Sequence, residues 1–143
     1  MPGLLVTMLT TSLAILILML AGGQDSQAIE QAPSSGIEKH WGIQIERLRL
    51  TAAGHMLDFR YRVTDVEKAK PLFLRQTKPY LVSQSGAKIG VFSSPKLGPL
   101  RHSYEPEAGK VYWTFFPNHN KLKAGDLVTI IIGDFKAENV KVE

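Results

Sequence analysis

The sequence has no cysteine, and this excludes several kinds of chemistry. Without a thiol there is no disulfide, no cysteine nucleophile, no cysteine-ligated zinc or iron–sulfur cluster, and no lipid-modified cysteine. Aromatic residues are few, at 8% of 143 residues, while the hydrophobic share of 44% is ordinary for a globular protein. This length and composition predict one small domain and exclude a disordered or collagen-like chain.

Charge is missing from the N-terminal segment. No charged side chain occurs from Gly3 to Gly23, and the run from Leu13 to Leu20 is almost purely aliphatic. At about 1.5 Å per residue, a helix over this segment is roughly 30 Å long, which is the thickness of a bilayer's hydrocarbon core. We therefore predict that residues 1–23 form a hydrophobic helix, either a cleaved signal peptide or an uncleaved membrane anchor.

Residues near this segment bear on cleavage and on orientation. Small residues at Ala21 and Gly23, or at Ser26 and Ala28, fit the pattern that precedes a cleavage site. Against cleavage, no lysine or arginine precedes Lys39, so the positive start of a signal peptide is missing. Because basic residues mark the cytoplasmic side, their absence here favours export of the remainder of the chain. We expect an extracytoplasmic protein on the periplasmic side, anchored in the inner membrane or secreted.

The rest of the chain divides into a linker and a domain. Residues 24–39 are polar and small and are interrupted by Pro33 and Gly36, which predicts a flexible linker. The domain then covers residues 40–143. It holds all but one of the 17 basic residues and all but three of the 13 acidic ones, which gives a formal charge of +6.

A two-residue period at the start of the domain predicts a β-hairpin. Apolar residues alternate with polar ones over 57–63, and over 43–50 if one extra residue forms a β-bulge near Glu46-Arg47. A turn at Ala53-Gly54 then sets the register of the two strands. The expected facing pairs are Leu50 with Leu57, Leu48 with Phe59, and Arg49 with Asp58.

Shorter signals predict the remaining elements. Thr64 and Glu67 have capping-box spacing, which predicts a helical turn over 66–70 that ends before Pro71. Apolar, β-branched and aromatic runs bounded by turn residues predict further strands. These lie at 80–83, 88–92, 111–116, 127–132 and 135–142. The fold class we predict is all-β: an antiparallel, immunoglobulin-like β-sandwich of about seven strands, preceded by one N-terminal hydrophobic helix.

The segment from Leu122 to Gly133 carries a resemblance to a known family. Its Lys123-Ala-Gly-Asp126 turn, followed by a valine- and threonine-rich strand, resembles the last strands of bacterial extracytoplasmic immunoglobulin-like domains. The chain looks like a member of a family of small domains of this type that are membrane-tethered or secreted. The resemblance implies a fold and no catalytic residues. We expect Asp126 to fix the turn through backbone hydrogen bonds.

A basic cluster is the first candidate binding surface. Four arginines, Arg47, Arg49, Arg60 and Arg62, are expected on the outer face of the hairpin, and more basic residues occur at 68, 70, 75 and 78. Such a patch suits an anionic lipid surface, an acidic polysaccharide or an acidic protein. The alternative is that Arg49–Asp58 and Glu46–Arg60 are ordinary cross-strand pairs, which contribute only about 0.2–1 kcal/mol each.

An aromatic strand is the second candidate. Within 111–116, Tyr112 and Phe116 point to one face and Trp113 to the other. Large side chains on both faces indicate either a strand covered on both sides or one that offers a face to a partner. Aromatic residues are enriched among interface anchors, so Tyr112, Trp113 and Phe116 are candidate contact residues.

Metal binding and catalysis have weaker signals. His55 and Met56 carry donor atoms that suit copper, but neighbouring strand residues point to opposite faces. We therefore predict no metal site, with His55 and Met56 as the one alternative. The sequence also lacks the nucleophile, zinc-protease and phosphate-loop motifs of common enzymes.

These observations predict a non-catalytic protein without a cofactor. We expect an interaction or accessory module that docks on another envelope protein or membrane complex, and that contacts the membrane through its N-terminal helix if this is uncleaved. Nucleic acid is not an expected partner, because no recognition motif is present. The alternative function is a periplasmic carrier of copper or of another small ligand.

Overall fold

The computed structural model describes residues 36–102, 105–119 and 121–143. The hydrophobic segment predicted over 1–23 and most of the predicted linker lie outside these residues. Helix α1 (Gly36–Trp41) occupies the last four positions of the predicted linker, 36–39, which are therefore helical. None of the helices in the described ranges is long and apolar enough to cross a membrane.

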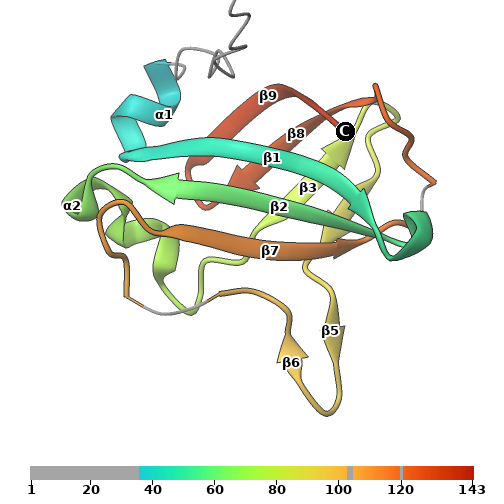
Figure 1. Ribbon diagram of the computed structural model, residues 1–143, viewed down its shortest axis with the longest axis horizontal. Coiled ribbons are helices and arrows are strands. Elements are labelled where there is room, and N and C mark those ends of the chain that lie inside the picture. The colour runs from blue at the N-terminus through green and yellow to red at the C-terminus, as the bar shows by residue number, and fades with distance from the viewer. Residues whose placement is uncertain (1–35, 103–104, 120) are drawn as a thin grey trace, which may run out of the picture. The chain divides into compact units, whose positions relative to one another are not determined.

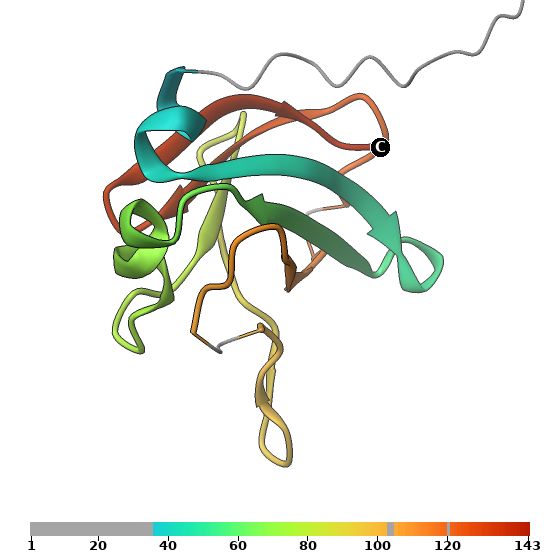
Figure 2. The same cartoon turned by 60° about the vertical axis from the view of Figure 1, so that its left-hand side comes forward.

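The described residues form an all-β fold of antiparallel sheets (Figure 1). One sheet has the strand order β1-β2-β7 and a second has the order β4-β3-β8-β9. Two very short strands, β5 and β6, form a ribbon that projects from the two sheets in both views (Figures 1 and 2). The strand bounds are β1 Ile43–Thr51, β2 Met56–Val63, β3 Tyr80–Ser83, β4 Lys88–Gly90, β5 Ser93–Ser94, β6 Gly98–Pro99, β7 Val111–Pro117, β8 Leu127–Ile132 and β9 Phe135–Lys141. All seven strands predicted from the sequence are present.

The β1–β2 hairpin has the predicted register. Leu48 pairs with Phe59, Arg49 with Asp58 and Leu50 with Leu57, and the register shifts between Ile45 and Arg47 as expected for a bulge. Its turn is a single 3₁₀ turn, Ala52–Gly54, with both alanines at positive φ. The bulge lets both strands keep apolar side chains toward the core, because the extra residue restores the alternation that the sequence interrupts.

The segment after β2 differs from the prediction. Helix α2 spans Val66–Ala69, and its N-cap is Asp65, whose carboxylate accepts from the backbone N–H of Lys68. The predicted Thr64 cap is therefore wrong by one residue. The α-helix ends before Pro71, as predicted, and a 3₁₀ turn that the sequence did not predict follows over Lys70–Phe73. Proline is tolerated there because the N–H groups at the start of a helical turn have no partner within it.

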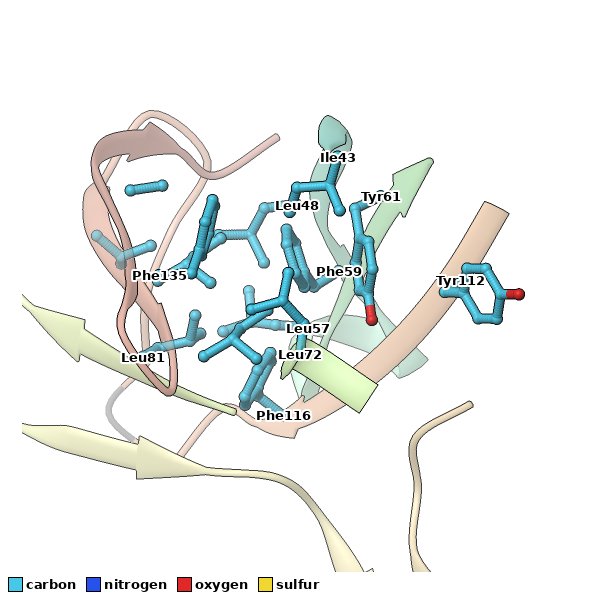
Figure 3. Packing of buried hydrophobic residues seen from close by; sticks show 14 of the residues in the cluster. Ile43, Leu48, Leu57, Phe59, Tyr61, Leu72, Leu81, Tyr112, Phe116 and Phe135 are labelled. Atoms are coloured by element: carbon cyan, nitrogen blue, oxygen red, sulfur yellow. The ribbon is translucent and has the colours of Figure 1, made fainter. Parts of the chain in front are cut away.

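One hydrophobic core lies between the two sheets (Figure 3). Phe59, Tyr112 and Phe116 come from the first sheet, and Ile130 and Phe135 from the second, and all five are fully buried. Each such aromatic side chain contributes several kcal/mol, since replacing a buried phenylalanine by alanine typically costs about 3–5 kcal/mol. The core thus fixes which face of each strand is turned inward.

Both edges of the β1-β2-β7 sheet are hydrogen-bonded to other parts of the chain. On the β1 side, Leu50 donates to the carbonyl of Glu143, and Glu143 donates to the carbonyl of Leu48. On the β7 side, Phe92 donates to the carbonyl of Phe115, and His102 to that of Trp113. An exposed sheet edge is a template for adding another strand. Here other described segments occupy the edges at these positions, so these positions do not accept an additional strand.

Gly42 joins α1 to β1 and has no substitute there. Its φ is +63°, and a Cβ at this position would lie 2.5 Å from the carbonyl oxygen of Asp65. Its own carbonyl accepts from the N–H groups of Thr64 and Asp65. The close approach therefore attaches the start of the hairpin to the segment that comes after it.

Candidate functional site

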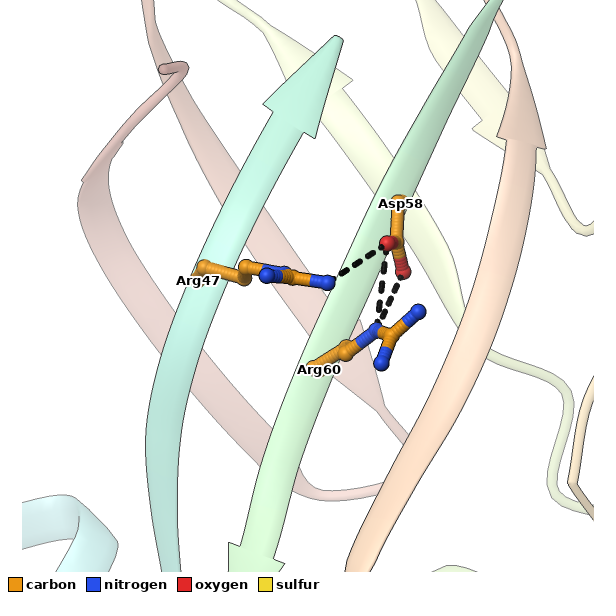
Figure 4. Close-up of polar contacts among 3 residues, drawn as sticks. All are labelled: Arg47, Asp58 and Arg60. Atoms are coloured by element: carbon orange, nitrogen blue, oxygen red, sulfur yellow. Dashed lines mark hydrogen bonds and ion pairs between the residues drawn. The ribbon is translucent and has the colours of Figure 1, made fainter. Parts of the chain in front are cut away.

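Three of the four hairpin arginines are paired with carboxylates. Asp58 is at the centre of the first group: Arg47 Nη2 lies 3.3 Å from its Oδ2, and Arg60 Nε lies 3.1 Å from both of its oxygens (Figure 4). The Asp58 side chain is only 4% exposed, against 30% for Arg47 and 39% for Arg60. The two cations thus neutralise a carboxylate that is nearly removed from water.

The second pair joins Arg62 to the bulge. Its Nε lies 2.7 Å from Glu46 Oε1, and its Nη1 donates to the carbonyl of Gly109 at 2.7 Å. The predicted cross-strand pairs therefore involve the right acids, Asp58 and Glu46, but the wrong arginines. Long side chains on a sheet reach diagonal neighbours as readily as directly facing ones, so the register alone does not choose between them.

Arg49 is the exception on this face. It is exposed, and among the described residues it has no ion pair or hydrogen-bond partner for its side chain. Although it faces Asp58 in the register, that carboxylate is already bound by Arg47 and Arg60. Arg49 therefore keeps a charge that is available to a partner.

The aromatic strand β7 divides between the core and the outer face. Tyr112 and Phe116 are both 0% exposed, so they belong to the core and cannot be contact residues of a folded surface. The Tyr112 hydroxyl donates to the carbonyl of Glu105 at 2.9 Å and accepts from the N–H of Glu107 at 2.8 Å. The prediction for these two residues is corrected, because they point to the inner face of the sheet and pack in the hydrophobic core.

Trp113 and Phe115 lie on the outer face and are partly exposed. Their ring centroids are 5.4 Å apart, and the His102 ring stacks on Trp113 at 5.7 Å. In the register Trp113 faces Arg60. Burial, and secondly the positive charge of Lys110, lower the pKa of His102 from its usual value. The outer face therefore combines an apolar strip with arginines. Phe115 is an additional candidate contact residue, which could have been predicted because the same alternation places it on the face of Trp113.

His55 and Met56 do not form an evident metal site. His55 is an exposed residue of the hairpin turn, and Met56, at the start of β2, is half-buried. In the described ranges no group of three or more histidine, cysteine, aspartate or glutamate side chains gathers as metal ligands would. The copper alternative remains a prediction.

The remaining members of the predicted basic cluster form two separate pairs. Lys68 and Lys70 pair with acids of their own helical turn, at 3.8 Å to Asp65 and 2.7 Å to Glu67. Residues 75 and 78 instead line a cleft of about 710 Å³. We call it the basic cleft, after the cations that line it: Arg75, Lys78, Lys88 and Arg101.

The turn motif behaves as predicted. The Asp126 carboxylate accepts from the backbone N–H of Lys123 at 2.8 Å, and the Asp126 N–H donates to the carbonyl of Lys123 at 3.0 Å. Gly125 supplies a positive φ of +95°. Asp126 thus holds the entry into β8.

Comparison of the chain with known protein families, with curated proteins and with solved structures found no match. Function is therefore inferred from the chemistry of two surfaces, the outer face of the β1-β2-β7 sheet and the basic cleft.

Proposed function

We propose that this protein is a non-catalytic interaction module that acts outside the cytoplasm by docking on another envelope protein or membrane complex. The observation that carries the proposal is the outer face of the β1-β2-β7 sheet, where partly exposed Trp113 and Phe115 adjoin arginines. We call the surface formed by Arg47, Arg49, Arg60, Arg62, Trp113 and Phe115 the docking face.

The docking face has the composition of a protein interface. In Figure 1 no other described element lies between these three strands and the viewer. Tryptophan and arginine are the residues most enriched among those that dominate binding energy, especially where apolar contact is surrounded by polar groups. Trp113 and Phe115 are therefore expected to supply apolar contact area.

The charge of the docking face favours an acidic partner. Its four arginines exceed the two acids that they contact, Asp58 and Glu46, by a formal charge of +2. An excess of one sign steers the encounter with an oppositely charged surface and fixes its orientation. We therefore expect the partner to present acidic residues around an apolar patch.

The strand order supports the finer assignment of an immunoglobulin-like sandwich. Counting only the seven longer strands, the first, second and fifth form one sheet, and the fourth, third, sixth and seventh form the other. The same grouping occurs in immunoglobulin-like domains whose second sheet includes the additional strand C′. Such domains commonly act as interaction modules, although the fold alone assigns no activity.

Export is proposed from the uncharged segment Gly3–Gly23. Intact mass of the protein isolated from its own cells tests the two forms of this proposal. A full-length mass in the membrane fraction supports an anchor. A mass lower by about 2.5–3 kDa in the soluble fraction supports a cleaved signal peptide. Recovery of the full-length chain in the cytosol would contradict both.

Site-specific cross-linking tests the docking proposal. We would place a photo-cross-linking amino acid at position 115 of the full-length chain and irradiate intact membranes. The expected result is one adduct of defined mass and fixed stoichiometry, which disappears in the Arg49→Glu variant and in the Trp113→Ser variant. Both positions are at the surface, so the variants should remain folded.

Two matched controls make the result specific. Leu97, on the β5–β6 ribbon, is 75% exposed, so Leu97→Ser removes an apolar side chain of another surface and should leave the adduct unchanged. The cross-linker at exposed position 136 on β9 should give no adduct. Equal adducts at 115 and 136, or an adduct that Arg49→Glu does not affect, would refute the proposal.

A further inference from the structure

The basic cleft is a second surface, separate from the docking face. It is bounded by the segment that leads into β3, by β4, and by the base of the β5–β6 ribbon. Its volume of about 710 Å³ is in the range of clefts that hold small organic ligands. The cleft is therefore a candidate binding site for the alternative function predicted from the sequence, a carrier of a small ligand.

The cations of this cleft have no acids to balance them. None of the described residues that line it is an aspartate or a glutamate. Arg75, Lys78, Lys88 and Arg101 also make no ion pair with any carboxylate in the described parts of the chain. Four positive charges around one concave surface repel one another and raise the local concentration of anions.

Arg101 is the fixed member of this group. Its Nη1 donates to the carbonyl of Thr77 and its Nη2 to that of Leu72, the latter at 3.2 Å. Its Nε is buried and has no hydrogen-bond partner among the described residues. Burial lowers the pKa of the guanidinium from its usual value, while the nearby Tyr61 hydroxyl acts in the opposite direction. A partly buried cation held by neutral carbonyls alone lacks the counter-charge that such groups usually have.

Other lining residues give the cleft a less polar wall. Pro79, Val91 and Pro99 contribute apolar surface. Lys88 Nζ lies over the Tyr80 ring, 4.0 Å from the ring centroid. This cation–π contact holds Lys88 at the cleft, because the ring attracts the ammonium group. A ligand with a charged end and an organic body would use both parts of the lining.

We propose that the basic cleft binds a phosphate group carried by a small phosphoester or by a lipid headgroup. A phosphate monoester has a charge of about −1.5 to −2 and three acceptor oxygens, so it engages several cations together. A single carboxylate, with one charge and two oxygens, would leave more of the four cations unbalanced. Arginine matches the phosphate oxygens as a planar fork, and lysine as a point charge. The basic cleft shares no residue with the docking face, so this proposal does not depend on the proposed docking function.

Calorimetric titration of the full-length chain, purified in a neutral detergent without phosphate, tests this site. Inorganic pyrophosphate is the first probe. Changing Lys78→Gln and Lys88→Gln together removes two cations that have no structural hydrogen bond. Because the charge-assisted hydrogen bonds from two lysines to the anion are lost, the dissociation constant should rise at least about tenfold. The wild-type protein should bind one pyrophosphate.

A variant with the same charge loss elsewhere is the control. Lys39 on α1 and Lys141 on β9 are exposed and do not line the cleft, so Lys39→Gln with Lys141→Gln should change the dissociation constant less than about twofold. Equal weakening in the two double variants would refute the site, because only general attraction would then operate. The absence of any binding to the wild type would also refute it.

A second pair of probes separates the two sources of phosphate. Short-chain phosphatidic acid, used below its micellar concentration, presents a monoester phosphate as a lipid headgroup, and glycerol 3-phosphate presents the same group as a soluble monoester. Tighter binding of the lipid, lost in the Lys78→Gln/Lys88→Gln variant, supports a headgroup site. Tighter binding of glycerol 3-phosphate, lost in the same variant, supports a soluble phosphoester. Binding of either that survives in this variant would overturn the proposal.

Discussion

The docking face and the basic cleft each contain four cations, but they differ in where the acids lie. On the docking face, Asp58 and Glu46 bind three of the four arginines directly. In the basic cleft no lining residue that the structure describes is acidic. Counting charges along the sequence therefore overestimates the free positive charge of the docking face. It also fails to reveal the positive charge of the basic cleft, whose cations are far apart in the sequence.

This difference separates two uses of positive charge. Where a carboxylate is nearly buried, arginines stabilise the fold and position neighbouring side chains, leaving aromatic residues and Arg49 to meet a partner. Where cations surround a cavity without acids, their charge is available to an external anion, and a cation without structural contacts, such as Lys78, adds little to stability. Substitutions and changes of salt or pH test this contrast.

Asp58→Asn should give the largest loss of stability. The change removes the negative charge and one of the two carboxylate oxygens that the Arg47 and Arg60 guanidinium groups share, and we expect the free energy of unfolding to fall by about 2 kcal/mol. Urea unfolding measures it. The control is Glu67→Gln, because the Glu67–Lys70 pair is 57–78% exposed and should contribute less than about 0.5 kcal/mol. Equal losses in the two variants would show that the Asp58 group has no special structural role.

Phosphate should stabilise the folded protein more than chloride does at the same ionic strength. A ligand at ten times its dissociation constant raises the free energy of unfolding by about 1.4 kcal/mol. The Lys78→Gln/Lys88→Gln variant should lose this difference, which thermal unfolding in the two salts measures. The comparison with the variant also removes any general salting-out effect of phosphate. A difference that persists in the variant would contradict an anion site in the cleft.

Neutralising one cation on each surface, without any ligand present, should lower the free energy of unfolding by different amounts. Arg60→Gln should cost about 1 kcal/mol, because the residue loses its contacts with Asp58. Lys78→Gln should change the free energy of unfolding by less than about 0.5 kcal/mol, since no structural contact is lost. Urea unfolding of both variants in chloride buffer measures the difference. If Lys78→Gln costs as much as Arg60→Gln, the cleft cations are structural.

The smallest effect concerns His102, which stacks on Trp113 at the border of the docking face. Its folded-state pKa is lowered, so the unfolded chain binds more protons below the usual histidine pKa of about 6.5. Stability should therefore fall as the pH drops below that value towards the folded-state pKa. The free energy of unfolding should depend less on pH in the His102→Gln variant than in the wild type. Parallel profiles would contradict the assignment.

Local pattern determined much of the fold. The two-residue period located the two strands of the hairpin, and runs of apolar residues bounded by turn residues located the other five longer strands. The interruption near Glu46 located the bulge and hence the register of the hairpin. These features could be predicted because they depend on residues close in sequence. The Asp126 turn was predictable for the same reason.

The candidate surfaces were harder to predict because they depend on what covers each face. Alternation showed that Tyr112 and Trp113 point in opposite directions, but not that the loop at 105–110 covers Tyr112. The arginine partners of Asp58 are a diagonal neighbour on β1, Arg47, and a neighbour on its own strand, Arg60, and not the residue that faces it in the register. Residues 75, 78, 88 and 101 come together only through the packing of segments that have no shared motif. No spacing in the sequence marks them as one site.

Amide chemical-shift mapping tests the central contrast most directly. The isotope-labelled full-length chain would be titrated with pyrophosphate, and the shift of each amide resonance measured. An anion site in the basic cleft predicts saturable changes confined to residues 75–80, 88–91 and 101, with no change along the hairpin strands 43–63. Changes centred on the hairpin arginines, or small linear changes at every exposed lysine and arginine, would contradict it.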